Sequence, residues 1–343
     1  MAEPIVSLDQ KVPGNSLSRL DFLMVWAALA VLAVVSAIFV PGTLAPSGLL
    51  AMLPFAAVLV IASIGQCLTI QSGGMDLSVP GSMTLAAAVV SGHADRQDGR
   101  IGSAVVLALV AVLVGGLLNG VAITKLRIPP IVATLAVNAL MLGFVQSYTG
   151  GVLKAVPPSL ATLASDKTLG IPNTLYVAAV FVVLAALAVT KTIWGRRLAA
   201  VGAQEDTARA AGIAVSRYVI GTYTAAGLCF GIAGILLAGY LRTPATTIAD
   251  PYLFSTITAV IVGGTAFGGG RSRIVGTAVG AVFVSQLNVF LTATGAPSSI
   301  TYLVQAAAIA VAVLLNSGGS LAEARRYVSR LLGRSPRRRV VST

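Results

Sequence analysis

Long apolar runs are the feature that most constrains the fold of this chain. Crossing the hydrocarbon core takes about 20 apolar residues in a helix, and backbone groups in lipid must be paired within the chain, which favours helices. We therefore predict an all-α polytopic membrane protein with about ten transmembrane helices, the run at 77–92 being weak and that at 254–268 short. The predicted spans are 22–40, 49–70, 77–92, 102–124, 130–148, 174–194, 217–240, 254–268, 274–292 and 299–316.

Composition agrees with this class. Of the 343 residues, 56% are hydrophobic and only 10% are charged, whereas about a quarter of the residues in soluble domains are charged. The run at 22–40 is longer than the apolar part of a signal peptide, and no small-residue cleavage site follows it, so we interpret it as a first membrane span.

The net charge of +12 is explained by topology. If the N-terminus is cytoplasmic and the spans alternate, 18 of the 23 Lys and Arg residues fall on the cytoplasmic side, as the positive-inside rule requires. No nucleic-acid partner is then needed. The sequence predicts a multi-pass membrane protein with both termini cytoplasmic, in three parts: an N-terminal segment 1–21, a ten-span domain 22–316 and a basic tail 317–343.

The basic tail has two interpretations. It is either a disordered anchor or, over 321–339, an amphipathic helix on anionic membrane lipid.

The sequence contains a weak internal duplication. The segment 73–89 is echoed by 263–282, and Leu118-Asn119 by Leu287-Asn288, which suggests two related halves at 49–148 and 254–316. Duplicated halves with a pathway between them are common in transporters.

Asp76 is the one acidic residue that is embedded in apolar sequence. Glycines before it and Pro80 after it predict a broken helix entrance, where Asp76 and Ser78 either cap the next helix or line a gate. A single carboxylate makes a poor proton relay, because relays use chains of ionisable groups.

Uncharged amides are the other polar groups in the spans. They either join helices by hydrogen bonds or line a pathway for a neutral polar solute, because an amide can both donate and accept. The candidates for such a pathway are Asn119, Asn138, Gln146, Asn288 and Gln305, beside Asp76 and Ser78.

Residue patterns typical of enzyme chemistry are absent from the sequence. His93 is the single histidine, Cys67 and Cys229 lie in separate spans, and there is no GxxxxGK[ST] phosphate-binding motif. We predict no catalytic residue, no bound metal and no cofactor.

A compact charged segment at 195–216 interrupts the apolar sequence near its middle. Its stretch "QEDTARAA" favours a short helix in which Glu205 and Arg209 can pair at i, i+4, with Gly212 as the stop signal. The segment is either an ordinary solvated loop helix or a docking helix for a cytoplasmic partner.

The order of these motifs resembles the membrane permease subunit of ribose-type sugar ABC importers. The motifs that carry the resemblance are "GGMDLSV" at 73–79, "PIVATL" at 130–135 with "TGG" at 149–151, "VGAQEDTARAAGI" at 201–213, and "VGGT" at 262–265 followed by "GGGR" at 268–271. The similarity covers about residues 22–316.

This resemblance implies a type II ABC importer-like permease that moves a small neutral polar solute, a monosaccharide first of all. It implies a separate cytoplasmic ATP-binding subunit, an external solute-binding protein, and a second permease, either a second copy or a sister chain. It also implies that 203–213 docks on the ATPase, with Gln204, Glu205, Asp206, Arg209 and Gly212 as the coupling residues. The alternatives are a nucleoside or furanose-like signalling molecule as the solute, or an ion-coupled secondary transporter.

Overall fold

The structure is a computed structural model that describes residues 16–316, with side chains described for 23–314. Most of the expected N-terminal segment and the whole basic tail therefore lie outside the described residues. Within 16–316 the regular elements are helices, apart from two short strands, β1 (Lys167–Thr168) and β2 (Ile171–Pro172), which pair antiparallel. The predicted all-α class is confirmed.

Thirteen α-helices make up the described chain. They are α1 (Ser16–Phe39), α2 (Pro46–Gln71), α3 (Val79–Ala94), α4 (Ile101–Thr124), α5 (Pro130–Thr149), α6 (Pro158–Ser165), α7 (Asn173–Lys191), α8 (Ile193–Ala203), α9 (Glu205–Ala210), α10 (Val215–Leu241), α11 (Tyr252–Val262), α12 (Ile274–Ala293) and α13 (Ser298–Asn316), with short 3-10 turns at Pro41–Thr43 and Asp98–Arg100.

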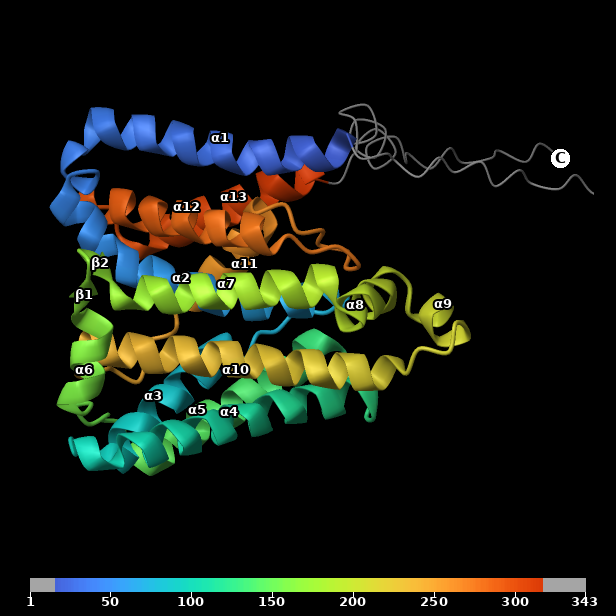
Figure 1. Cartoon of the computed structure of the whole chain (residues 1–343), viewed down its shortest axis with the longest axis horizontal. Coiled ribbons are helices and arrows are strands. Elements are labelled where there is room, and N and C mark those ends of the chain that lie inside the picture. Colours follow the sequence, from blue (N-terminus) through green and yellow to red (C-terminus); the bar gives the residue numbers. More distant parts are fainter. Residues whose placement is uncertain (1–15, 317–343) are drawn as a thin grey trace, which may run out of the picture.

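The long helices lie side by side along one axis (Figure 1). The β1–β2 hairpin and α6 lie at one end of the bundle, called here the α6 end, and α8 and α9 lie at the other, called the α9 end (Figure 1). Six helices in 16–316 are long and apolar enough to cross a membrane, and three shorter apolar helices accompany them at Leu23–Phe39, Tyr252–Val262 and Ser298–Leu314. The chain is thus a polytopic membrane protein.

Two expectations about helix bounds are wrong. The span expected at 254–268 ends at Val262, because Gly264 has φ +82°, which ends the helix. The charged segment holds two helices rather than one, since α8 forms a separate helix before α9. Its start is fixed by Thr192, whose Oγ1 accepts a hydrogen bond from the backbone N–H of Gly195 at 3.2 Å.

Helices α2 and α10 form the centre of the bundle, where Ile61, Ile64 and Phe230 are completely or almost completely buried. Helix α10 lies against α4 through glycines: a Cβ added at Gly116 would lie 2.4 Å from the Tyr223 carbonyl oxygen. Small residues at such spacing allow two helix backbones to approach closely in a membrane.

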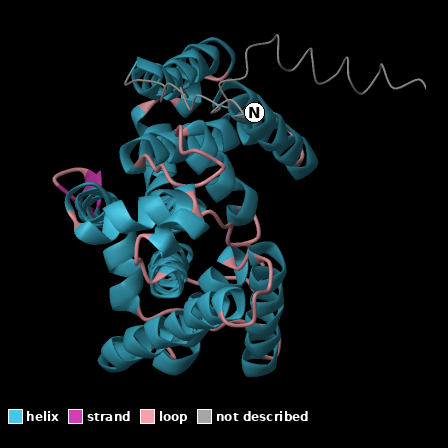
Figure 2. Ribbon diagram, turned by 90° about the vertical axis from the view of Figure 1, so that its right-hand side faces the viewer, coloured by secondary structure: helices cyan, strands magenta, loops and turns pink. Residues whose placement is uncertain are grey.

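Two groups of four helices repeat one packing pattern. In α2–α5 the short second helix, α3, packs against α4 and α5; in α10–α13 the short second helix, α11, packs against α12 and α13. The first helix of each group crosses into the other, so that α10 packs against α3 and α4, and α2 packs against α11 and α12. Figure 2 shows the same bundle after a turn of 90°.

The pattern differs from the halves expected from sequence. The second group begins at Val215 rather than at 254, and the echoing segments 73–89 and 263–282 start between different helix pairs, α2–α3 and α11–α12. Because α2 and α10 run in opposite directions, the breaks that follow them, at 72–78 and 242–251, lie at opposite ends of the bundle (Figure 1). This is the geometry of an inverted repeat.

Candidate functional site

Helix α9 projects from one end of the bundle (Figure 1), and its charged residues Glu205, Asp206 and Arg209 are exposed. Arg209 pairs with Glu205 one turn earlier and approaches Asp206 at 3.9 Å. Gly212 follows in the left-handed conformation, φ +77°, and ends the segment. The expected helix, its i, i+4 ion pair and its glycine stop are therefore present.

The inner side of α9 is apolar. Ala208 is buried against a cluster formed by Val201, Val215, Val219 and Tyr223. Gln204, the residue between α8 and α9, is exposed, as are Glu205, Asp206 and Arg209, so α9 is held by one face and leaves the other exposed.

A glycine junction joins this segment to the bundle. A Cβ at Gly202, at the end of α8, would lie 1.8 Å from the carbonyl oxygen of Gln71 and 2.7 Å from the backbone nitrogen of Gly270. Gly270 N–H donates to that same oxygen at 2.9 Å, and Ser272 Oγ donates to the Gln71 side chain at 2.8 Å. Three backbone segments thus meet where only glycine fits: the end of α8, the end of α2 and the α11–α12 loop.

Directly beyond α2 lies a buried polar cluster, here called the α9-end cluster and made of Asp76, Ser78 and Asn119. Asp76 Oδ1 accepts from the Ser78 backbone N–H at 2.8 Å and from Ser78 Oγ at 2.5 Å, and Asn119 Nδ2 donates to Ser78 Oγ at 2.9 Å. All three residues are at most 1% exposed. The second oxygen of Asp76 and the amide oxygen of Asn119 have no hydrogen-bond partner.

The capping expectation holds for one residue of two. Asp76 binds the backbone of Ser78, the N-cap residue of α3, but the Ser78 side chain makes no cap hydrogen bond. Two α5 side chains support the same turn: Thr134 Oγ1 accepts from Leu77 N–H at 3.0 Å, and Asn138 Oδ1 accepts from Gly81 N–H at 2.7 Å. Asn138 thus joins helices in this structure.

A second polar group, the α6-end group, consists of Ser255, Asn288 and Gln305. Gln305 Nε2 donates to Ser255 Oγ at 3.1 Å and to Asn288 Oδ1 at 3.0 Å, and Gln305 itself is 1% exposed. The structure therefore brings the predicted pair Asn288 and Gln305 together. It does not bring Gln146 to either group, since that side chain is exposed at the end of α5, next to Gly151.

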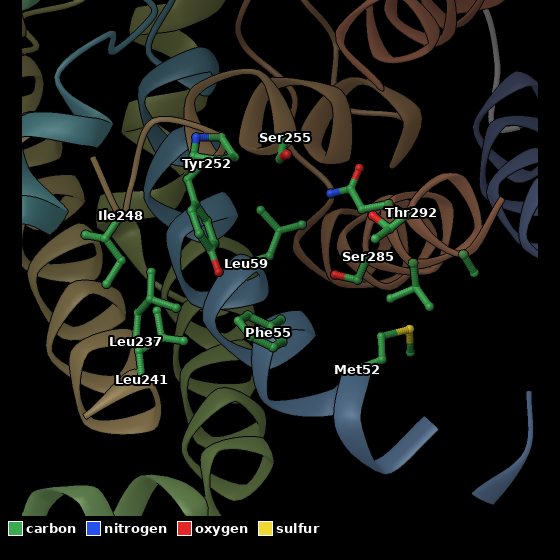
Figure 3. A pocket seen from close by; sticks show the side chains of 14 residues that line it. Met52, Phe55, Leu59, Leu237, Leu241, Ile248, Tyr252, Ser255, Ser285 and Thr292 are labelled. Atoms are coloured by element: carbon green, nitrogen blue, oxygen red, sulfur yellow. The ribbon is translucent and has the colours of Figure 1, made fainter. Parts of the chain in front are cut away.

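The α6-end group borders a cavity of about 510 Å³ (Figure 3). Helices α2, α10, α11 and α12 and the loop before α11 supply its walls. The lining residues are Met52, Phe55, Leu59, Leu237, Leu241, Ile248, Pro251, Tyr252, Ser255, Ser285, Asn288, Val289, Thr292 and Ala293. None of these fourteen carries a charge, and hydroxyl or amide groups stand among apolar walls.

Several of these residues were missed by sequence reasoning. Ser255, Ser285 and Thr292 resemble the other small polar residues of apolar helices, and Tyr252 begins a helix whose start was predicted two residues later. The one usable signal was the repeated Leu-Asn pair, because it marks Asn119 in one group and Asn288 in the other.

Among the carboxyl groups at the α6 end, Asp95 and Asp250 have pKa values that are shifted in opposite directions. A hydrogen bond from Lys154, at 3.0 Å, holds the pKa of Asp95 below its ordinary value. Partial burial raises the pKa of Asp250, which precedes Pro251 at the rim of the cavity. Asp95 and Lys154 thus form an exposed ion pair at the end opposite α9.

Known proteins are similar in sequence to this chain over most of its length. Residues 48–313 match the family described as "Branched-chain amino acid transport system / permease component". The chain belongs to this family of transport permeases. It is 32% identical to the ribose import permease protein RbsC of Bacillus subtilis over 84% of this chain and 90% of that one.

Two further relatives come from Escherichia coli K12. Identity to its ribose import permease protein RbsC is 30% over 90% of this chain and 98% of the relative, and identity to its galactofuranose transporter permease protein YtfT is 32% over 76% and 77%. No solved structure matches the chain. The family confirms a transport subunit rather than an enzyme.

Proposed function

We propose that this chain is the membrane permease of an ABC importer that moves a monosaccharide across the bacterial inner membrane. The names of its relatives, ribose and galactofuranose permeases, carry the solute class. A separate ATP-binding subunit supplies the energy and an external solute-binding protein delivers the sugar. The uncharged cavity at the α6 end suits a neutral solute.

The shape of α9 supports its role as the ATPase-coupling helix. It carries Glu205, Asp206 and Arg209 on its exposed side, and Gln204 and Gly212 flank it, while the buried Ala208 fixes it to the bundle. The glycine junction at Gly202 then provides a rigid connection from α9 to the α9-end cluster.

We propose ten spans, with α3 as the weakest, and a second permease beside the first.

Charge supports an orientation with the α9 end in the cytoplasm. Basic residues in the loops and helix ends are more numerous at the α9 end than at the α6 end. The positive-inside rule assigns the end with more basic residues to the cytoplasmic face. Those at the α9 end are Lys125, Arg127, Lys191, Arg196, Arg197, Arg209, Arg217, Arg271 and Arg273, and those at the α6 end are Arg96, Arg100, Lys154, Lys167 and Arg242.

An ion-coupled secondary transporter is the weaker candidate. Such a carrier would use Asp76, but one oxygen of that carboxyl group already holds the turn before α3. The relatives named above are import permeases, and nothing in the α9-end cluster supplies a second acidic group among the described residues.

The test is co-purification of the ATPase from mild detergent with the full chain and with the double variant Glu205→Arg plus Arg209→Glu. This exchange keeps an ion pair on α9 but reverses the charges that a partner meets. We expect the wild type to retain the ATPase and the variant to lose it.

The matched control reverses an equally exposed pair at the other end, Asp95→Lys plus Lys154→Asp. This variant should retain the ATPase. Absence of any ATPase from the wild type in several mild detergents would contradict the proposed function.

A further inference from the structure

Helix α8, which precedes the proposed coupling helix, has two different faces. Leu198 and Val201 are buried, three positions apart, on the face that packs against the bundle. The opposite face carries Ile193, Arg196 and Arg197, and all three are exposed. Since Ile193 lies three and four positions before the two arginines, these side chains share one surface.

Helix α8 begins where the apolar surface of α7 ends (Figure 1). A Cβ at Gly195 would collide with the backbone of Val189, in the last turn of α7, so the two helices are in direct contact there. Helix α7 is long and apolar enough to cross a membrane, and outer side chains such as Leu184 and Leu187 are about half exposed. This apolar surface ends at Lys191, which places the start of α8 at the level where hydrocarbon gives way to lipid headgroups.

The direction of α8 orders its exposed side chains along the membrane normal. Side chains on a helix lean toward its N-terminus. The N-terminus of α8 is the end that meets α7, so Arg196 and Arg197 lean back toward the membrane boundary, and Ile193, which is 60% exposed, lies one turn nearer the hydrocarbon. An apolar side chain followed by two basic ones matches the order of acyl chain and phosphate in a phospholipid.

Basic side chains without a counter-charge gather at this boundary. The group, here called the α8 patch, consists of Lys191, Arg196, Arg197 and Arg217, which are all exposed. None of the four forms an ion pair with another residue in the part of the chain that the structure describes. The acidic residues of the adjoining α9, Glu205 and Asp206, are both engaged by Arg209. The patch therefore lacks an anion.

We propose that the α8 patch binds the phosphate group of an anionic phospholipid, with Arg196 and Arg197 as its principal contacts. A guanidinium group matches a phosphate with two parallel N–H groups. Arg197 donates one N–H to the hydroxyl oxygen of Tyr218, in α10, at 3.2 Å, which positions the group and leaves its other N–H groups for the phosphate. The acyl chains of the same lipid lie along Ile193 and the outer surface of α7.

An acidic surface of a partner protein is the competing occupant. Helix α9 lies farther from the bundle than α8, so such a partner meets α9 first (Figure 1). The partner also has no use for the exposed Ile193 or the apolar side of α7, whereas a lipid uses both. Binding of the lipid does not depend on transport; only the leaflet, the cytoplasmic one, follows from the orientation proposed above.

The chain supplies its own probe for this site, because Trp194 lies in the first turn of α8. The other tryptophan, Trp26, is removed by Trp26→Phe, so that the fluorescence of the full chain reports on α8 alone. The purified chain in mixed micelles receives phosphatidylglycerol or phosphatidylcholine with bromine atoms on the acyl chains near the headgroup, which quench tryptophan on contact. We expect half-maximal quenching at an about 25-fold lower concentration of phosphatidylglycerol, about fivefold for each arginine.

Charge-neutral and charge-conserving variants locate the contact. With Arg196→Gln plus Arg197→Gln, the two lipids should quench equally. The matched control, Arg96→Gln plus Arg100→Gln, removes two exposed arginines at the α6 end and should keep the full preference. Arg196→Lys plus Arg197→Lys keeps the charge and should retain most of it. High salt should weaken the preference without any substitution, because it screens exposed charges.

Two results would overturn the proposal: equal quenching by the two lipids when α8 is unchanged, or a preference that survives Arg196→Gln plus Arg197→Gln. If the lipids quench equally and this double variant also loses the ATPase during co-purification, the patch belongs to the ATPase instead. Neither result touches the proposed function, which fails when no ATPase co-purifies with the wild type.

Discussion

At the scale of single residues, Gly202 has the tightest backbone environment near α9. Its hydrogen faces the carbonyl oxygen of Gln71 and the backbone nitrogen of Gly270, and backbone atoms cannot rotate away as a flexible side chain can. A side chain at this position must therefore push α8 away from α2 and the α11–α12 loop. The sequence shows Gly202 only as one of 36 glycines, so this constraint becomes visible in three dimensions alone.

We predict that Gly202→Ala lowers the free energy of unfolding by about 1–3 kcal/mol, the usual cost of overpacking a well-packed site. The measurement is the midpoint of thermal denaturation of the purified chain in detergent. Gly221→Ala is the matched control, because a Cβ at this helical glycine meets nothing within 4 Å. The control should raise stability by about 0.5–1 kcal/mol, because alanine favours a helix more than glycine does; equal midpoints for the two variants would contradict the argument.

At the scale of elements, α9 is held to the bundle by a single buried side chain of its own. Ala208 is 3% exposed and packs in the cluster with Val201, Val215, Val219 and Tyr223, whereas Ala210 of the same helix is exposed. The exposed surface, to which we assign the partner contact, and the surface that holds the helix are therefore separate, and each can be changed alone.

Ala208→Asp should detach α9 without altering the charged residues at 205, 206 and 209. Burying an unpaired carboxylate is costly, so the helix must leave its cluster. We expect co-purification of the ATPase to fall to the level of the charge-reversed variant. Ala210→Asp adds the same charge on the exposed side and should retain the ATPase; if both variants retain it, α9 does not need its fixed position for coupling.

How much of these elements could be predicted from sequence depends on the physical signal. Apolar length predicts the helices, and the i, i+4 charge pair with a following glycine predicts α9. These signals fail where the three-dimensional packing sets the bounds of an element. Helix α11 ends earlier than predicted because Gly264 turns the chain. The bounds of the second helix group were predicted wrongly because α10 shares no motif with α2. The site shows the same limit, since Asn288 was found as an uncharged amide inside a predicted span whereas Tyr252 and Ser285 had no distinguishing pattern.

At the scale of the whole molecule, the inverted repeat and the distribution of charge carry different information about which end of the bundle faces the cytoplasm. Inversion makes the two ends of the bundle alike in construction, so it cannot by itself decide which end faces the cytoplasm. Charge supports the orientation proposed above, with the α9 end in the cytoplasm, because that end carries the larger share of the basic residues. In the proposed orientation the glycine junction, the α9-end cluster and α9 itself lie on the cytoplasmic side, and the cavity lies toward the external side.

This orientation predicts opposite accessibility for two exposed positions. Leu169, in the β1–β2 turn, is 93% exposed, and the side chain of Asp206, in α9, is 94% exposed, so a cysteine at either position meets water and differs only in the side it faces. A membrane-impermeant maleimide should label Leu169→Cys in intact cells and Asp206→Cys only after the membrane is permeabilised. Labelling of Asp206→Cys in intact cells, with Leu169→Cys protected, would reverse the molecule in the membrane. It would then place α9 beyond the reach of any cytoplasmic ATPase, because a helix on the outer face cannot couple to ATP hydrolysis.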